Sequence, residues 1–122
     1  MEAGSVDLDY GRSTRNIPPS LDAALVIRDE VCRFPGCVRT ADLCEVHHVD
    51  WWDHGGGTAP DNTVIMCVRH HHELHEPGWH AKLLPDAEFR VTKPDGTELV
   101  SAPRYGEFRI GVDSWLIEGG SR

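Results

Sequence analysis

The residues of this chain that could do chemistry are concentrated in one stretch. All 8 histidines lie between His47 and His80. The segment EVHHVDWWDHGGGTAPDN, residues 45 to 62, is followed closely by HHHELH, residues 70 to 75. Imidazole binds transition-metal ions and can also accept a proton near neutral pH. The pattern therefore indicates a metal-dependent hydrolytic site.

The spacing of the histidines separates two roles. In a strand, neighbouring side chains such as those of His47 and His48 point to opposite faces. On a helix, His71 and His75 are four residues apart and lie on one face, where they can share an ion. We assign His47 to that ion, because a three-histidine site is then complete, and His48 to the free role of general base. A dication held by neutral imidazoles keeps its full charge and can polarise a phosphodiester oxygen.

Three further polar residues are expected to support the site. Asn62 could bond backbone groups across the glycine-rich loop and could reach His48 itself, although an Asn here could also be a simple turn residue. Glu45 is either a solvated strand residue or an acceptor for a histidine N–H. His54, His72 and His80 are expected to be bystanders, and His72 is the one of the three best placed to reach a phosphate.

The cysteines indicate a second metal site. Cys32 and Cys37 bracket a turn, and Cys67 is spaced C-x2-H from His70. Two short chelating pairs separated by a loop-sized gap are typical of a closed tetrahedral zinc site. Cys44 could replace His70 as the fourth ligand, but we expect it to pack within a strand, because Cys67 and His70 can chelate from one turn. Buried free cysteines are the alternative interpretation.

Length and charge limit the class of protein. A chain of 122 residues with 39% apolar residues predicts one domain with a small core. A net charge of -8, from 20 acidic and 12 basic residues, argues against a broad basic surface for nucleic acid. No apolar run approaches the ~20 residues that span a bilayer, and the N-terminus lacks the features of a secretory signal. We therefore expect a cytoplasmic protein with reduced cysteines.

The elements that must position these residues predict an α+β fold. Ser20 is expected to cap a helix over LDAALVIRDE. The segments that follow are predicted as a tight turn at CRFPGC, a strand at LCEVHHVDWW, a loop at HGGGTAPDN and a helix at TVIMCVRHHHELH that stops at Pro77-Gly78. WHAKLL and EFRVTK are predicted as strands, before a turn at Pro94-Asp95-Gly96. The predicted organisation is an extended polar arm over 1–20, a metal-binding module over 21–84 and a C-terminal strand extension over 85–122.

Together these motifs resemble the HNH (ββα-metal, His-Me finger) endonuclease family. The signature is His48-x13-Asn62-x8-His71. The stretches GRSTRNIPPSLDAALVIRDEVCRFPGC, HHVDWWDHGGGT, DNTVIMCVRHHHELH and PGW are similar to the bacterial and phage branch in which the HNH module closes a longer helical protein. The resemblance covers residues 8 to 99. It implies a small zinc-stapled α+β domain in which a β-hairpin and a helix clasp one divalent ion, with a flanking helix and a C-terminal β-hairpin.

The resemblance also implies a role for each matched residue. His48 matches the general base, and Asn62 matches the residue that orients it. The ligands of the catalytic ion, which could be Mg²⁺, Mn²⁺, Ni²⁺ or Zn²⁺, would be His47, His71 and His75. The ligands of a structural zinc ion, with Cys-x2-His in place of the commoner Cys-x2-Cys, would be Cys32, Cys37, Cys67 and His70.

The expected function is therefore hydrolysis of DNA phosphodiester bonds, by nicking or by double-strand cleavage, with 5′-phosphate and 3′-hydroxyl products. Members of this branch carry a large helical domain upstream, so we expect either a stand-alone short form or one module of a larger protein. The acidity of the chain predicts weak affinity for DNA, or affinity supplied by a further protein or domain. The alternative function is a non-catalytic zinc module that docks nucleic acid or protein.

Overall fold

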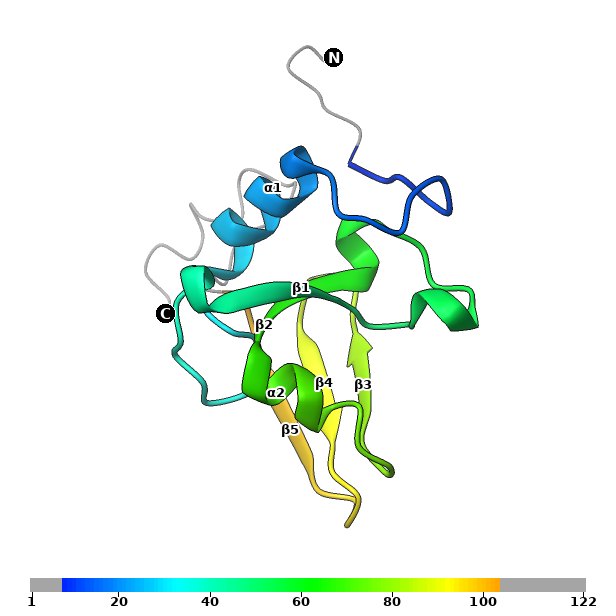
Figure 1. Cartoon of the computed structure of the whole chain (residues 1–122). Coiled ribbons are helices and arrows are strands. Elements are labelled where there is room, and N and C mark those ends of the chain that lie inside the picture. Colours follow the sequence, from blue (N-terminus) through cyan, green and yellow to red (C-terminus); the bar gives the residue numbers. More distant parts are fainter. Residues whose placement is uncertain (1–7, 104–122) are drawn as a thin grey trace.

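Two helices and two antiparallel sheets make up the part of the chain that the computed structural model describes, residues 8–103 (Figure 1). The helices are α1, Pro19–Asp29, and α2, Val68–Glu73. The first sheet pairs β1, Cys44–His48, with β2, Thr63–Cys67. The second is ordered β3, His80–Leu83, then β4, Phe89–Thr92, then β5, Glu98–Ser101. Three 3-10 turns lie at Ala41–Leu43, Trp52–His54 and Pro60–Asn62. The predicted α+β class is confirmed.

β2 is the central strand of the fold, and both of its faces are covered. All five of its residues are buried. Val64 and Met66 pack with β4 in the main core, whereas Ile65 packs against α1 on the other face. A strand that is covered on both faces has a continuous apolar sequence instead of an alternating one.

The prediction of one helix over TVIMCVRHHHELH is wrong for its first five residues, because these form β2. They pair antiparallel with β1 in a register that places Cys44 opposite Cys67 and His48 opposite Thr63. A short apolar run cannot be assigned to helix or strand from periodicity alone. The β-branched residues of TVIMC favour a strand, and the helix begins only at Val68.

α1 covers the face of β2 that lies opposite the main core. Leu21 and Leu25 are fully buried there against Ile65. The prediction that Ser20 caps this helix is wrong, because the N-cap is Pro18 and no side chain caps the helix. The Ser20 hydroxyl is instead hydrogen-bonded to the Tyr10 hydroxyl at 2.8 Å. Pro19 occupies the first helical position, which suits proline because its fixed φ is already helical.

A buried charged network joins α1 to both sheets. Asp29 accepts hydrogen bonds from Arg28 and Arg33, each at 2.7 Å, and none of the three side chains is substantially exposed. Arg28 also donates to the carbonyl oxygen of Thr63 at 2.7 Å, and Arg33 donates to that of Ser101 at 3.2 Å. Buried charges persist only where they are paired and hydrogen-bonded. The network therefore ties the start of β2 and the end of β5 to the end of α1.

The C-terminal sheet has one more strand than the two that were predicted. The strands at WHAKLL and EFRVTK are confirmed as β3 and β4, and the turn at Pro94-Asp95-Gly96 leads into β5. β5 was missed because its four residues, ELVS, include only two apolar ones, and none of the four is fully buried. Residues 1–7 of the predicted arm and 104–122 of the predicted extension lie outside the described residues.

The described part of the N-terminal arm, residues 8 to 18, lies against the rest of the fold. Leu8, Tyr10 and Ile17 pack beside α1 on its small core. The N–H of Tyr10 donates to the carbonyl oxygen of Thr58, and the N–H of Thr58 donates to that of Gly11, each at 2.8 Å. Figure 1 shows this dark blue arm beside the green loop between β1 and β2. In residues 8–103 no helix is long and apolar enough to cross a membrane.

Candidate active site

The cysteine group, defined as Cys32, Cys37, Cys67 and His70, has its four donor atoms within 4.8 Å of one another. Cys32 and Cys37 come from the tight turn after α1, where the N–H of Cys37 donates to the carbonyl oxygen of Phe34 at 2.9 Å. The Nδ1 atom of His70 lies 3.7 Å from the Sγ of Cys32 and 3.3 Å from that of Cys67. Sulfur and nitrogen ligands of a tetrahedral zinc ion are about 3.5 Å apart. The cysteine group could therefore hold a metal ion.

Cys44 is not a member of the cysteine group. The fourth donor beside Cys32, Cys37 and Cys67 is His70, as we expected from the sequence. The Sγ of Cys44 contacts the carbonyl oxygen of Thr40 at 3.4 Å. Burial raises the pKa of Cys32 to about 12 and that of Cys44 to about 11. Metal binding by Cys32 must therefore release a proton, which makes metal affinity depend on pH.

The histidine group, defined as His47, His71 and His75, also has its donor atoms within 4.8 Å of one another. His47 is only 2% exposed, and its ring centroid lies 4.8 Å from that of His71 and 5.6 Å from that of His75. The Nδ1 atoms of His47 and His71 are buried and have no hydrogen-bond partner among the described residues. A buried polar atom without a partner costs about 1–3 kcal/mol. A cation would satisfy these nitrogens, so this group could also hold a metal ion.

Burial favours the neutral form of two members of the histidine group, His47 and His75. Burial, assisted by the neighbouring His71 and His75, lowers the pKa of His47 to about 3. Burial, followed by His71 and His72, also lowers the pKa of His75. Neutral imidazole is the form that binds metal ions. The Glu45 carboxylate lies 3.4 Å from the Nδ1 of His71, which is close enough for an electrostatic contact but does not make a hydrogen bond.

His75 lies just beyond α2 and not on it, contrary to the predicted helical pair. The helix ends at Glu73, and the N–H of His75 donates to the carbonyl oxygen of His72 at 3.0 Å. Trp51 stacks on His75 with a centroid distance of 4.6 Å and an interplanar angle of 10°. The turn and this stacking still bring the ring centroids of His71 and His75 to 5.0 Å. His72 is exposed.

His48 lies on the opposite face of β1 from His47, as strand alternation predicts, and is not part of the histidine group. Its Nε2 atom is hydrogen-bonded to the Oγ1 of Thr58 at 2.9 Å. Burial, followed by the positive charges of Arg15 and Arg12, lowers the pKa of His48. The ring is therefore neutral at neutral pH and can accept a proton.

Asn62 fastens the loop that follows β1. Its Oδ1 accepts a hydrogen bond from the N–H of Asp50 at 2.7 Å, and its Nδ2 donates to the carbonyl oxygens of Asp50 at 3.0 Å and Gly57 at 2.8 Å. A Cβ atom at Gly56 would lie 1.7 Å from the carbonyl oxygen of Asp50, so only glycine permits this approach. None of these bonds goes to His48, so the direct contact that the sequence suggested is not among them.

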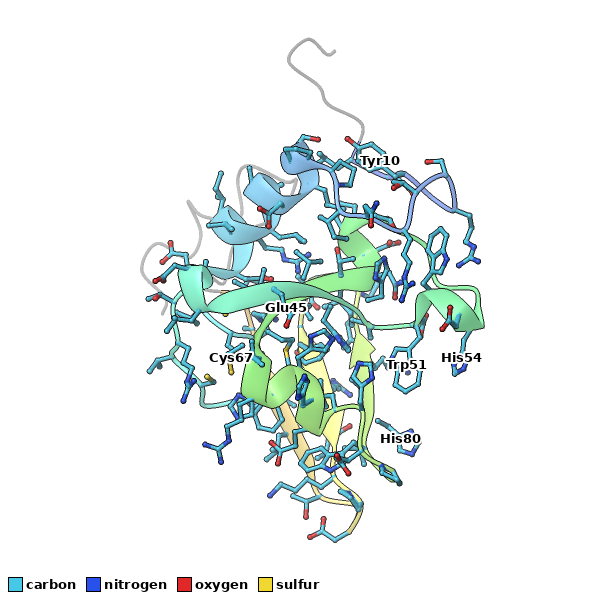
Figure 2. The ribbon with its side chains drawn as sticks, viewed as in Figure 1. Tyr10, Glu45, Trp51, His54, Cys67 and His80 are labelled. Atoms are coloured by element: carbon cyan, nitrogen blue, oxygen red, sulfur yellow. The ribbon has the colours of Figure 1, made fainter. Side chains whose placement is uncertain are left out.

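One groove brings His48 and the histidine group together. It has a volume of about 470 Å³ and is lined by His47, His48, His71, His75, Arg15 and Trp52. A second groove of about 620 Å³ also reaches His47 and His75, but it is lined by His54, Trp79 and His80 in place of His48. Figure 2 shows Trp51, His54 and His80 on this side of the molecule. The smaller groove, which we call the reaction groove, is the one that His48 shares with all three members of the histidine group.

Three residues of the site were missed from the sequence: Arg12, Arg15 and Thr58. The guanidinium of Arg12 lies 3.8 Å over the ring of Trp52 and donates to the carbonyl oxygen of Trp52 at 2.7 Å. Two arginines within GRSTRN are a visible signal in an acidic chain. Their place beside His48 nevertheless depends on contacts between the arm and a loop 40 to 44 residues away in sequence, and the sequence alone does not reveal these contacts.

Comparison with known proteins finds relatives that are much longer than this chain. It is 34% identical over 107 residues to the uncharacterized protein Rv3776 of Mycobacterium tuberculosis, and the aligned region covers 85% of this chain and 20% of that protein. It is 36% identical over 90 residues to the uncharacterized protein Rv2100 of the same species, and the aligned region covers 73% of this chain and 16% of that protein. The chain thus spans a fifth or less of the length of these curated relatives. No family model matches the chain, and no solved structure matches it.

Proposed function

We propose that this chain is a metal-dependent endonuclease of the HNH (ββα-metal) class that hydrolyses DNA phosphodiester bonds by nicking or double-strand cleavage. The observation that carries the proposal is that His48 and the histidine group line one groove, with His48 and His47 on opposite faces of β1 and with His71 and His75 contributed from α2 and the turn after it. The element order β1, β2, α2 supports it, because a hairpin followed by a helix is the arrangement that the resemblance implies.

His47, His71 and His75 would hold the catalytic divalent ion. Imidazole donors suit Mn²⁺, Ni²⁺ and Zn²⁺ better than Mg²⁺, which prefers oxygen ligands, and all four ions are candidates. When bound, such an ion supplies positive charge that stabilises the charge developing on the phosphate in the transition state. The two buried nitrogens without partners, on His47 and His71, support this assignment.

His48 is the general base in this proposal. Its neutral imidazole accepts a proton from a water molecule, and the water oxygen forms a bond to phosphorus while the bond from phosphorus to the 3′ oxygen breaks. The 3′ oxygen takes up a proton from solvent, so the products carry a 5′-phosphate and a 3′-hydroxyl. The lowered pKa of His48 supports this role, because it keeps the base unprotonated at neutral pH. Asn62 orients the base indirectly by fastening the loop after β1.

The cysteine group would hold a structural zinc ion. Four protein ligands close a tetrahedral site and leave no position for substrate. The ligands come from the turn after α1, the end of β2 and the helix α2. Zinc there would fasten α2, and with it His71, against the hairpin.

DNA binding must overcome the net charge of -8. Arg15 lines the reaction groove with its exposed side chain and is placed to contact a phosphate. We propose that a further protein or domain supplies additional affinity for DNA, and that the protein acts in the cytoplasm. We propose that Glu45 acts as a negative charge beside His71, in place of the hydrogen-bond acceptor that the sequence suggested, and that the exposed His72 contacts a phosphate.

Cleavage of supercoiled plasmid tests the proposed function. With Mg²⁺, Mn²⁺, Ni²⁺ or Zn²⁺ added in turn, the wild-type chain should convert the plasmid to nicked or linear forms. His48→Ala should lose about 10²–10⁴ in rate while keeping its fold and its metal, because a general base is used only in the reaction. His80→Ala is the matched control, since His80 is an exposed histidine that does not line the reaction groove.

Two results would contradict the proposal. A chain that binds DNA but leaves the plasmid intact with every one of these ions would support the alternative, a non-catalytic zinc module that docks nucleic acid or protein. Cleavage by His48→Ala at the wild-type rate would remove His48 from the role of base.

A further inference from the structure

A single buried hydroxyl, that of Thr58, connects His48 to the N-terminal arm. Thr58 is 0% exposed. Its Oγ1 lies 2.9 Å from the Nε2 of His48 and donates a hydrogen bond to the carbonyl oxygen of Thr14 at 2.6 Å. Both partners of this hydroxyl are therefore protein atoms, and the directions of its hydrogen bonds can be worked out.

The directions follow from the number of protons. A carbonyl oxygen can only accept, so the one proton of the Thr58 hydroxyl is used in the bond to Thr14. The Oγ1 of Thr58 then presents only lone pairs to His48. The hydrogen bond between them requires a proton on the Nε2 of His48. In the neutral ring, the lone pair that accepts a proton is consequently on Nδ1.

The backbone of Thr58 is held by the same arm. Its N–H donates to the carbonyl oxygen of Gly11, and its own carbonyl oxygen accepts from the N–H of Tyr10, each at 2.8 Å. A Cβ atom at Gly57 would lie 3.3 Å from the carbonyl oxygen of Gly11, which is tighter than an ordinary contact. The arm from Tyr10 to Thr14 therefore sets both the place of the threonine and the direction of its hydroxyl.

We propose that Thr58 is a positioning residue that fixes His48 as the Nε2–H tautomer, with the carbonyl oxygen of Thr14 orienting the Thr58 hydroxyl. The consequence for catalysis rests on the proposed function, whereas the tautomer itself does not. Which nitrogen of a histidine carries the proton is set by the hydrogen bond that the ring makes. Without this bond, both tautomers would be populated and the ring could turn, so the required lone pair would be presented only part of the time.

The ¹⁵N NMR spectrum of the His48 ring, recorded on the full chain without DNA at alkaline pH, tests the tautomer. Protonated and unprotonated ring nitrogens have well separated shifts, and His48→Ala identifies the His48 signals. The wild type and Thr58→Ser, which keeps the hydroxyl, should show the proton on Nε2. Thr58→Val, which has nearly the same shape but no hydroxyl, should show a mixture of tautomers.

Cleavage rates give the second readout. Thr58→Val should lose about 10-fold to 100-fold in rate, as is typical when a hydrogen bond that orients an active-site group is removed, and Thr58→Ser should recover most of it. A wild-type His48 with its proton on Nδ1, or with both tautomers populated, overturns the proposal, as does a Thr58→Val ring that keeps the pure Nε2–H form. If Thr58→Val does not fold, the wild-type and Thr58→Ser spectra still decide. The Nε2–H tautomer in a chain that cleaves no DNA would support the role of Thr58 and refute only the nuclease.

Discussion

The cysteine group and the histidine group differ in how completely the protein surrounds them. The cysteine group has four donors, and Cys32 and Cys67 belong to the main core. His70 is stacked on Phe34 at a centroid distance of 4.0 Å and an interplanar angle of 5°. The histidine group has three donors and opens onto the reaction groove. A site with four protein ligands is suited to stability, and a site with three leaves a position for chemistry.

The two groups share α2, and this makes their relation unequal. His70 and His71 are neighbours in sequence, yet they belong to different groups. The short helix has only six residues, and isolated helices of this length are not stable in water. We therefore expect its position to depend on the cysteine group, because Cys67 is its N-cap and His70 lies within it. Loss of the cysteine group should disrupt the histidine group, whereas loss of the histidine group should leave the cysteine group intact.

The largest expected effect is the loss of folding in Cys32→Ser. Metal binding to sites of this kind contributes about 10–16 kcal/mol in zinc-finger peptides, and this free energy is coupled to folding. Thermal unfolding followed by circular dichroism, together with metal analysis, should show no cooperative transition and no bound zinc. Cys44→Ser is the matched control and should melt close to the wild type, because Cys44 lies outside the cysteine group. A Cys32→Ser variant that kept its zinc and its melting temperature would show that the two groups do not differ as proposed.

The second effect is selective loss of one metal ion in His71→Ala. This variant should bind one ion fewer per chain, keep the ion of the cysteine group and lose metal-stimulated cleavage. Alanine is a good helix former, so stability without the second ion should change by about 1 kcal/mol or less. Metal analysis and thermal unfolding check both statements. His72→Ala, at the exposed neighbouring position, should keep both ions. Loss of the cysteine-group metal in His71→Ala would mean that the dependence runs in both directions.

All members of the two groups except His47, which lies on β1, can be predicted from the sequence as locally spaced pairs. C-x4-C, C-x2-H and His-x3-His each place two donors within a turn or two of the chain. The structure brings these donors together as two groups. The secondary structure around them is less predictable. β2 is buried on both faces, so its hydrophobic periodicity does not distinguish a buried strand from a buried helix, and only its β-branched residues favour the strand.

The remaining features depend on contacts that are distant in sequence. Charged residues are seldom fully buried, so nothing in the local sequence marks Arg33 as a buried partner of Ser101 on β5, which lies 68 residues later. Thr58 has the same character. It follows three glycines in an apparent loop, and its role depends on the carbonyl oxygen of Thr14, which lies 44 residues earlier. Local patterns therefore identify the donors, whereas the tertiary fold determines how the base is oriented.

The smallest expected effect concerns the charge beside the reaction groove. Each phosphate contacted by Lys or Arg adds about -0.9 to the log–log slope of affinity against salt for duplex DNA. A chain with a net charge of -8 offers few such contacts, and we expect a slope of about -2. Affinity measured over a salt series, with the non-cleaving His48→Ala chain and a divalent ion, gives this slope.

Arg15→Ala, introduced into the same His48→Ala chain, should make the slope shallower by about 0.9, because Arg15 lines the reaction groove. Lys82→Ala is the control, since Lys82 is an exposed cation on β3 and lines neither the reaction groove nor the second groove. A slope difference of about 0.9 changes the ratio of the two variants' affinities only about twofold for each doubling of the salt concentration. The slope over a salt series is therefore a better measure than a single dissociation constant. A slope near -8 without a divalent ion, unchanged by Arg15→Ala, would show that DNA binds away from the histidine group. The histidine group would then not be the place where the chain binds its substrate. The difference between three donors there and four in the cysteine group would not reflect a division between catalysis and stability.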